Sequence, residues 1–325
     1  MPCYTPLPAE YSGRYTKTGK FAVNVYSRTD PRFVDGRSQM KVPCGQCIGC
    51  RLDYSREWAV RCMHESQLYE PTVDNPNGRG NCFITLTYND EFLPPNGSLN
   101  YRHWTLFMKR LRKRYGSDIR FYMGPEYGEL SGRPHYHALL FNFSFDDMVL
   151  FSIRNGNRLY RSASLDSLWP CPKSGRSYGF ASVGTVTFES AAYVARYMMK
   201  KVKGDDHMLR YFTQVDLDTG EIIPIAPEKA RMSRMPGIAR DWFDLYSSEL
   251  YPSDEVVLSG GRKCMPPSYY DRILEQMDPD MFHSIKSLRV DNALANKANS
   301  TPDRLAVRLK CKEISLKSLP RPIDL

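Results

Sequence analysis

The sequence predicts an α+β fold with a central antiparallel sheet and flanking helices. Apolar runs rich in β-branched and aromatic residues are typical of strands, and they occur at residues 82–88, 118–126, 134–141 and 178–187. Residues 101–115 and 189–203 contain no Gly or Pro and carry apolar side chains on one side, which predicts helices. A glycine-containing turn between the second and third runs makes them an antiparallel hairpin.

Composition favours a nucleic-acid partner. The 325-residue chain is 42% hydrophobic, carries a formal net charge of +9 and has a pI near 9.0. A basic balance favours an anionic partner, nucleic acid before a membrane surface. The sequence contains no run of about 18 apolar residues, so we expect no transmembrane helix. The N-terminus lacks a signal-peptide pattern. We therefore expect a cytosolic protein without a membrane partner.

Loops and composition divide the chain into three regions. Residues 1–80 form a turn-rich N-terminal region, with a short strand expected at 21–26 and a helix at 51–68. Residues 81–203 hold the predicted sheet, and residues 204–325 form a C-terminal extension. Inside the sheet region, residues 142–176 are expected to be an insertion with one or two helices. In the extension we expect a hairpin at 211–225 and helices at 241–251, 269–277 and 301–316.

The cysteine pattern suggests a metal site in the N-terminal region. Nine cysteines in a cytosolic chain indicate reduced thiols or a metal, not disulfides. Cys44, Cys47 and Cys50 alternate with glycines that permit a tight knuckle. Tetrahedral Zn²⁺ needs a fourth ligand, for which Cys62 is the choice, with Cys3 and His64 also candidates. A partial iron–sulfur ligand set and three plain reduced thiols are the alternatives.

The third strand presents two imidazoles on one face. His135 and His137 are two residues apart, so their side chains project together, with Tyr136 on the opposite face. A hairpin turn near residues 130 and 131 would place Glu126 opposite His135. Two imidazoles and one carboxylate form a mixed N/O ligand set suited to Mg²⁺ or Mn²⁺. Glu129 is the reserve carboxylate, although an ordinary solvated turn residue is the simpler interpretation.

The helix after the fourth strand carries two tyrosines at helical spacing. Tyr193 and Tyr197 are one turn apart and share a face, and Lys200 and Lys201 follow. Tyrosines at this spacing are often plain core residues. A tyrosine can also attack a phosphodiester and keep the phosphate, given a metal and a cation.

A run of basic residues ends the first predicted helix of the sheet region. Its five cations suit both the negative C-terminal end of a helix dipole and a phosphate-contacting patch. The candidate DNA-binding residues are Lys109, Arg110, Arg112, Lys113 and Arg114.

The motifs together resemble a known superfamily. Residues 83–88, Pro134–His137 and the Tyr193–Tyr197 helix follow the order seen in HUH endonucleases of rolling-circle replication. The cysteine knuckle, residues 190–197 and residues 232–238 are similar to the gokushovirus branch of the Microviridae, phages with single-stranded DNA. The resemblance covers roughly residues 40 to 245.

The resemblance implies a five-stranded, RRM-like antiparallel sheet and a nick at the phage origin through a 5′-phosphotyrosine, with later rejoining. It makes His135, His137 and Glu126 the ligands of Mg²⁺ or Mn²⁺. Tyr193 and Tyr197 would be the nucleophiles, and Lys200 or Lys201 the phosphate-facing cation. It also implies host helicase and polymerase as partners in the bacterial cytoplasm. Alternatives are a non-catalytic DNA-binding protein on this fold, or a relaxase or transposase of the superfamily.

Overall fold

The chain consists of two compact units. The computed structural model describes residues 2–16, 19–31, 40–128, 131–154, 156–197, 211, 214–215 and 219–317. One unit comprises residues 1–54 with 286–320, and the other is built on residues 55–285. These boundaries differ from the three regions predicted above, because the segment after residue 204 contributes to both units.

The first unit holds a three-stranded antiparallel sheet in the order β2-β1-β3. Its elements are β1 (Leu7–Tyr15), β2 (Phe21–Val25), β3 (Met40–Val42), the start of α1 (Ile48–Gln67), the end of α8 (Pro279–Ala295), and α9 (Pro302–Lys317). The strand and two helices expected in these stretches are present. Little of this sheet is covered, since the rings of Tyr11, Tyr15 and Phe21 are exposed.

The second unit is organised by a seven-stranded antiparallel sheet in the order β12-β5-β6-β4-β9-β8-β7. Its strands are β4 (Asn81–Tyr88), β5 (Arg120–Tyr127), β6 (Pro134–Phe141), β7 (Val149–Arg154), β8 (Asn157–Arg161), β9 (Gly179–Gly184) and β12 (Arg231–Met232). All four predicted core strands are present. The resemblance implied five strands, whereas added strands at both edges give the described sheet seven.

The insertion contains a hairpin that the sequence analysis did not predict. Within the insertion at residues 142–176, one expected helix is present as the short α3 (Ala163–Leu168), and the hairpin β7–β8, which was not expected, precedes it. Gly156 lies in the turn with a φ of +80°, a backbone conformation that glycine adopts without a steric penalty. The hairpin extends the sheet edge, and most of β7 is exposed, so it lacks the alternating burial that would have identified it.

Helix α2 (Tyr101–Tyr115) has the predicted ends. The Asn100 side chain accepts a hydrogen bond from the backbone N–H of Arg102 and so caps the first turn. At the other end, Gly116 has a φ of +118° and terminates the helix. Trp104, Phe107 and Leu111 lie on its buried side.

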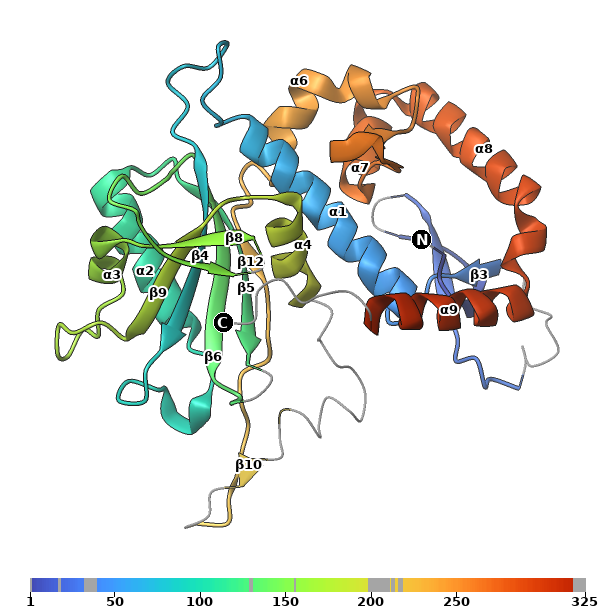
Figure 1. The fold of residues 1–325 in the computed structure, drawn as a ribbon. Coiled ribbons are helices and arrows are strands. Elements are labelled where there is room, and N and C mark those ends of the chain that lie inside the picture. The colour runs from blue at the N-terminus through green and yellow to red at the C-terminus, as the bar shows by residue number, and fades with distance from the viewer. Residues whose placement is uncertain are drawn as a thin grey trace. The chain divides into compact units, whose positions relative to one another are not determined.

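Helices cover both faces of the sheet (Figure 1). On one face α2 and α3 enclose a core that includes Ile84, Tyr136 and Leu140. On the other face a second core includes Phe83, Leu139 and Phe141, residues that alternate with the first set along the same strands. The helices contributing to this second core are α1, α4 (Phe188–Tyr197), α6 (Arg240–Leu250), α7 (Ser268–Met277) and the start of α8.

Two short ladders complete the unit. They are the hairpin predicted at residues 211–225, formed by β10 (Gln214–Val215) and β11 (Ile222–Ile223), and the pair β13 (Val256–Val257) and β14 (Lys263–Cys264). None of the helices that the structure describes is long and apolar enough to cross a membrane.

Candidate active site

A row of four facing residues crosses one face of the sheet. Glu126 on β5 pairs with His135 on β6, which confirms the register predicted from the hairpin. His135 also pairs with Thr87 on β4, and Thr87 pairs with Phe180 on β9. Directly opposed residues of antiparallel strands point to the same face. The side chain of Phe180 is 59% exposed, so this row ends in an aromatic ring open to solvent.

The neighbouring row carries the second histidine. His137 pairs with Gly124 on β5 and with Thr85 on β4, and Thr85 pairs with Ser182 on β9. His137 and Thr85 are each only 2% exposed. The two imidazoles stand side by side, with ring centroids 6.1 Å apart. Both histidines therefore lie on the sheet face predicted for them.

Threonines of β4 hold the two imidazoles in the same way. Thr85 Oγ1 lies 3.0 Å from His137 Nδ1, and Thr87 Oγ1 lies 3.1 Å from His135 Nδ1. When Nδ1–H donates to the threonine oxygen, Nε2 carries the lone pair that a metal ion needs. The sequence analysis gave neither threonine a role. The available signal in the sequence was their spacing: like the two histidines, the two threonines are two residues apart on a strand.

The carboxylate approaches the buried histidine. Glu126 Oε2 lies 3.4 Å from His137 Nε2, and both side chains are almost fully buried. Beside His135, a Cβ at Gly128 would lie 3.0 Å from Nε2, so glycine leaves space next to this nitrogen. Among the described residues, however, only a cluster of four cysteines gathers its ligand atoms within 4.8 Å of one another. His135, His137 and Glu126 thus share one face of the sheet, but their ligand atoms are spaced more widely than those of the cysteine cluster.

Helix α4 lies directly against the histidine face. A Cβ at Gly124 would lie only 2.8 Å from the backbone oxygen of Val194, so glycine in β5 permits this close approach. The Tyr193 ring then contacts the His137 ring edge-to-face, with centroids 5.2 Å apart. Reciprocal hydrogen bonds between Thr187 and Ser190 cap the helix start, where the sequence predicted it. Tyr193 and the histidines are therefore brought together.

Several predicted site residues lie where the structure gives no side-chain description. The backbone of Tyr197 ends α4 one turn after Tyr193, but its side chain is outside the described atoms. Lys200 and Lys201 lie outside the described residues, as does Glu129. The roles expected of these four residues stay predictions.

Tyr136 belongs to the opposite face, as its position between the histidines predicted. Its hydroxyl donates to the Asn100 carbonyl oxygen and accepts from the Asn100 N–H, each at 2.9 Å. Burial raises the pKa of Tyr136 to about 12. This tyrosine is therefore a core residue and not a third nucleophile.

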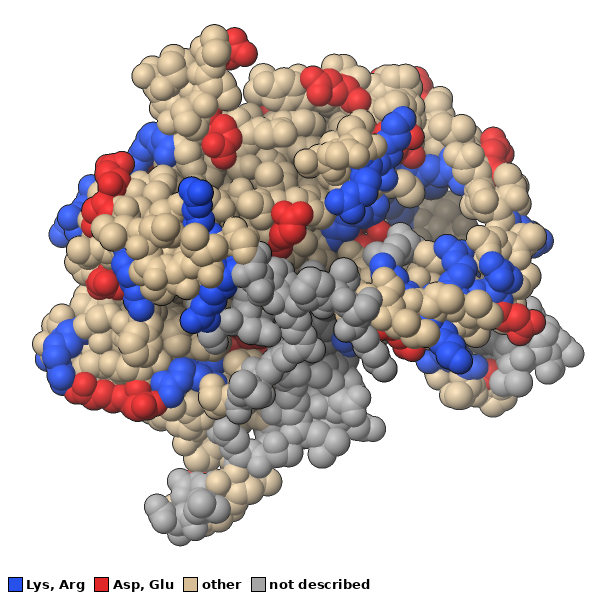
Figure 2. Space-filling view, in the orientation of Figure 1, with Lys and Arg blue, Asp and Glu red and all other residues tan. Residues whose placement is uncertain are grey.

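The basic run of α2 is on the other side of the sheet from the histidines, because α2 packs against the opposite core. Three of its arginines contact the protein: Arg112 donates to the Ile119 carbonyl oxygen, Arg110 to that of Leu168, and Arg114 to the Ser167 hydroxyl. Lys109 and Lys113 are exposed. In the second unit, Lys and Arg side chains are interspersed with Asp and Glu on the face drawn in Figure 2. DNA binding by the basic run stays a prediction, and the run is not part of the histidine site.

The fourth member of the predicted cysteine site is corrected. Cys3, not Cys62, lies with Cys44, Cys47 and Cys50. Cys50 and Cys62 both lie on α1, about 18 Å apart along the helix axis, so they cannot bind one ion. Cys62 is fully buried in the second unit, and burial raises the pKa of its thiol.

The other candidate, His64, is also occupied by core packing. Its Nδ1 lies 2.8 Å from the Tyr270 hydroxyl, and its ring stacks on Trp242. Burial lowers the pKa of His64 to about 3, so this imidazole is neutral near pH 7.

Comparison with known proteins gives a consistent family. A family profile described as "Replication-associated protein ORF2/G2P" matches residues 81–202. Replication-associated protein ORF2 of Spiroplasma virus 4 is 34% identical over 254 residues, covering 74% of this chain and 70% of the relative. Replication-associated protein VP4 of Bdellovibrio phage phiMH2K is 32% identical, covering 86% and 79%. Replication-associated protein ORF4 of Chlamydia phage 1 is 26% identical, covering 76% and 58%. No solved structure matches the chain with significance.

Proposed function

Because this chain belongs to the family of phage replication-associated proteins, we propose that it initiates rolling-circle replication by nicking single-stranded DNA at the phage origin. The reaction would be site-specific and metal-dependent, would pass through a 5′-phosphotyrosine, and would later rejoin the strand. The observation that carries the proposal is the contact between Tyr193 and His137 beside Glu126 and His135.

The residues on this face suit a divalent cation. Two imidazoles whose Nδ1 atoms contact threonines, with a buried carboxylate beside them, are a mixed N/O donor set that accepts Mg²⁺ or Mn²⁺ when phosphate oxygens complete the shell. His135, His137 and Glu126 would hold the ion. When bound, it would polarise the scissile phosphate and stabilise the developing charge.

The tyrosines would perform the transfer. The phenolate oxygen of Tyr193 or Tyr197 attacks phosphorus, the bond from phosphorus to the 3′ oxygen breaks, and the leaving 3′ oxygen takes up a proton to become a hydroxyl. The enzyme then carries the 5′ phosphate as a phosphotyrosine. Attack by a free 3′ hydroxyl reverses these bonds and closes the strand. Phe180, exposed at the end of the Glu126–His135–Thr87 row, offers a face on which a DNA base can stack.

The covalent step is tested directly. Purified protein is incubated with labelled single-stranded oligonucleotides that tile the parental phage genome, with Mn²⁺ or with a chelator. We expect one oligonucleotide to give a denaturation-resistant protein–DNA adduct in Mn²⁺ and none with chelator. Binding without an adduct on any oligonucleotide would support the non-catalytic alternative and refute the nicking proposal.

The threonine contacts predict a metal-affinity effect. Thr85→Val and Thr87→Val keep the side-chain shape but remove the oxygen that contacts Nδ1 of each histidine. We expect each variant to need about 10- to 100-fold more Mn²⁺ for half-maximal cleavage, because such outer partners fix the ligand orientation.

The matched control is Thr105→Val, whose hydroxyl donates to the Tyr101 backbone on α2, on the other side of the sheet. It should leave the Mn²⁺ midpoint unchanged. If the two β4 variants titrate like the wild type, the threonines do not support the metal site.

The cellular setting follows from the family. We place the protein in the host bacterial cytoplasm, where the origin strand, a host helicase and a polymerase would be its partners.

A further inference from the structure

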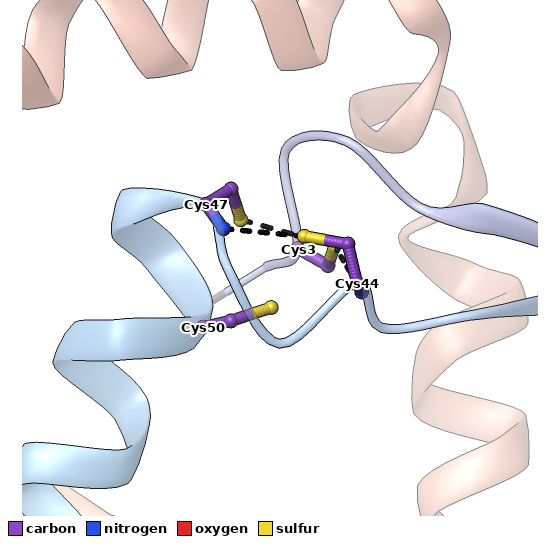
Figure 3. A group of neighbouring side chains, drawn as sticks. All are labelled: Cys3, Cys44, Cys47 and Cys50. Atoms are coloured by element: carbon purple, nitrogen blue, oxygen red, sulfur yellow. Dashed lines mark hydrogen bonds between the residues drawn. The ribbon is translucent and has the colours of Figure 1, made fainter. Parts of the chain in front are cut away.

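Four cysteines from two distant segments converge in the first unit (Figure 3). Cys3 comes from the N-terminal segment, Cys44 and Cys47 from the turn before α1, and Cys50 from its first turn. Their sulfur atoms all lie within 4.8 Å of one another, and no other group of potential ligands in the described part of the chain is gathered so tightly.

We propose that Cys3, Cys44, Cys47 and Cys50 bind one structural Zn²⁺ that joins the N-terminal segment to the start of α1. A Zn–S bond of about 2.3 Å places the sulfurs of a tetrahedral site about 3.8 Å apart. The Cys3 and Cys47 sulfurs are 3.8 Å apart.

Two other cysteine chemistries fit less well. A disulfide needs sulfurs about 2.05 Å apart. In a [4Fe–4S] cluster, each thiolate binds a different iron, which separates the sulfurs more widely than a single ion does. The tight grouping of four sulfurs therefore favours one ion.

Backbone N–H groups point at the sulfurs. The N–H of Cys44 donates to Cys3 Sγ at 3.2 Å, and that of Tyr4 donates to Cys47 Sγ at 3.3 Å. The N–H groups of Gln46 and Cys47 both donate to Cys44 Sγ, at 3.4 and 3.2 Å. Such donors stabilise negative charge on sulfur, as does the N-terminal end of α1. The cluster is thus built for thiolates, which are the form that binds zinc.

Two glycines make this convergence possible. Gly45 has a φ of +69°, which turns the chain between Cys44 and Cys47. A Cβ at Gly49 would lie 2.2 Å from the backbone oxygen of Pro2 and 2.9 Å from the Tyr4 ring. Because residue 49 lacks a side chain, the N-terminal segment lies directly on the first turn of α1 and delivers Cys3.

The first unit has little else to hold it together. Among its described residues, the buried apolar side chains are those of Tyr4, Ala9 and Leu305. Small units with cores of this size usually depend on disulfides or a metal. Zinc binding would supply that stabilisation by closing the chain between residues 3 and 44, which contains β1, β2 and β3.

Metal analysis of the full-length protein tests the proposal. Elemental analysis should find about one zinc and no iron per chain. Cys3→Ser should lower the zinc content at least about tenfold, since serine is a poor zinc ligand. Cys311→Ser is the matched control, because Cys311 is an exposed cysteine of the same unit outside the cluster, and it should keep its zinc.

A second measurement does not depend on how the variants fold. The wild-type protein loaded with Co²⁺ should show the absorption bands of tetrahedral cobalt bound to four thiolates. Iron with its characteristic visible absorption, a Cys3–Cys47 disulfide, or zinc retained in full by Cys3→Ser would each overturn the proposal. Because these readouts do not involve DNA, they are independent of the nicking proposal.

Discussion

The double variant Tyr193→Phe/Tyr197→Phe should lose covalent DNA cleavage by ~10⁴-fold or more, because it removes both candidate nucleophilic oxygens. Phenylalanine keeps the ring, so the edge-to-face contact with His137 and the packing of α4 should survive. Adduct formation on the origin oligonucleotide measures cleavage, and a gel shift measures binding. We expect binding close to that of the wild type.

The single variants separate the two tyrosines. Tyr193→Phe removes the hydroxyl of the residue that contacts His137, whereas Tyr197→Phe changes the residue one turn further along α4. Tyr246→Phe on α6 is the control, since this partly exposed tyrosine packs against Trp242 of the same helix. Cleavage that persists in the double variant at more than a few per cent of the wild-type rate would refute the nucleophile assignment.

Local patterns predicted the parts of the site that lie on neighbouring strands. The hairpin between β5 and β6 fixed the pairing of Glu126 with His135, because the turn of a short hairpin determines which residues of its two strands face each other. The ends of α2 were predictable because Asn100 and Gly116 are strong boundary residues.

What the sequence did not reveal depends on contacts between distant segments. Cys3 joins the knuckle only because the N-terminal segment crosses the first turn of α1 at Gly49. Thr85 and Thr87 resemble ordinary strand residues until β4 pairs with β6. Two local signals were available: Asn155-Gly156 is a hairpin dipeptide, and a glycine inside a strand, Gly124, indicates close backbone approach.

Glu65→Ala should strongly destabilise the second unit. Glu65 on α1 is 1% exposed, forms an ion pair with Arg120 of β5, and accepts a hydrogen bond from the Ala239 N–H. Removing one partner of a buried ion pair costs about 3–5 kcal/mol, because the other charge stays buried without compensation. For a unit of this size, that corresponds to a fall in thermal midpoint of roughly 10 °C.

The reason for this large effect is that Glu65 holds the loop before α6. Arg120 also donates to the carbonyl oxygens of Pro236 and Gly237, and Arg61 donates to that of Ile238. The carbonyl oxygens of residues 236–238 and the N–H of residue 239 are thus hydrogen-bonded to side chains of α1 and β5. The residues around 232–238 that resemble the phage branch therefore have a structural role in joining α6 to the sheet.

A surface ion pair provides the matched control. Glu255 Oε2 lies 2.6 Å from Lys263 Nζ, but the two side chains are 42% and 60% exposed, respectively. Glu255→Ala should therefore change the unfolding free energy by less than about 1 kcal/mol. Urea and thermal unfolding of both variants measure the difference. Equal midpoints for Glu65→Ala and Glu255→Ala would mean that α1 and the loop before α6 are held by apolar packing alone, and that the buried carboxylate contributes nothing to the fold.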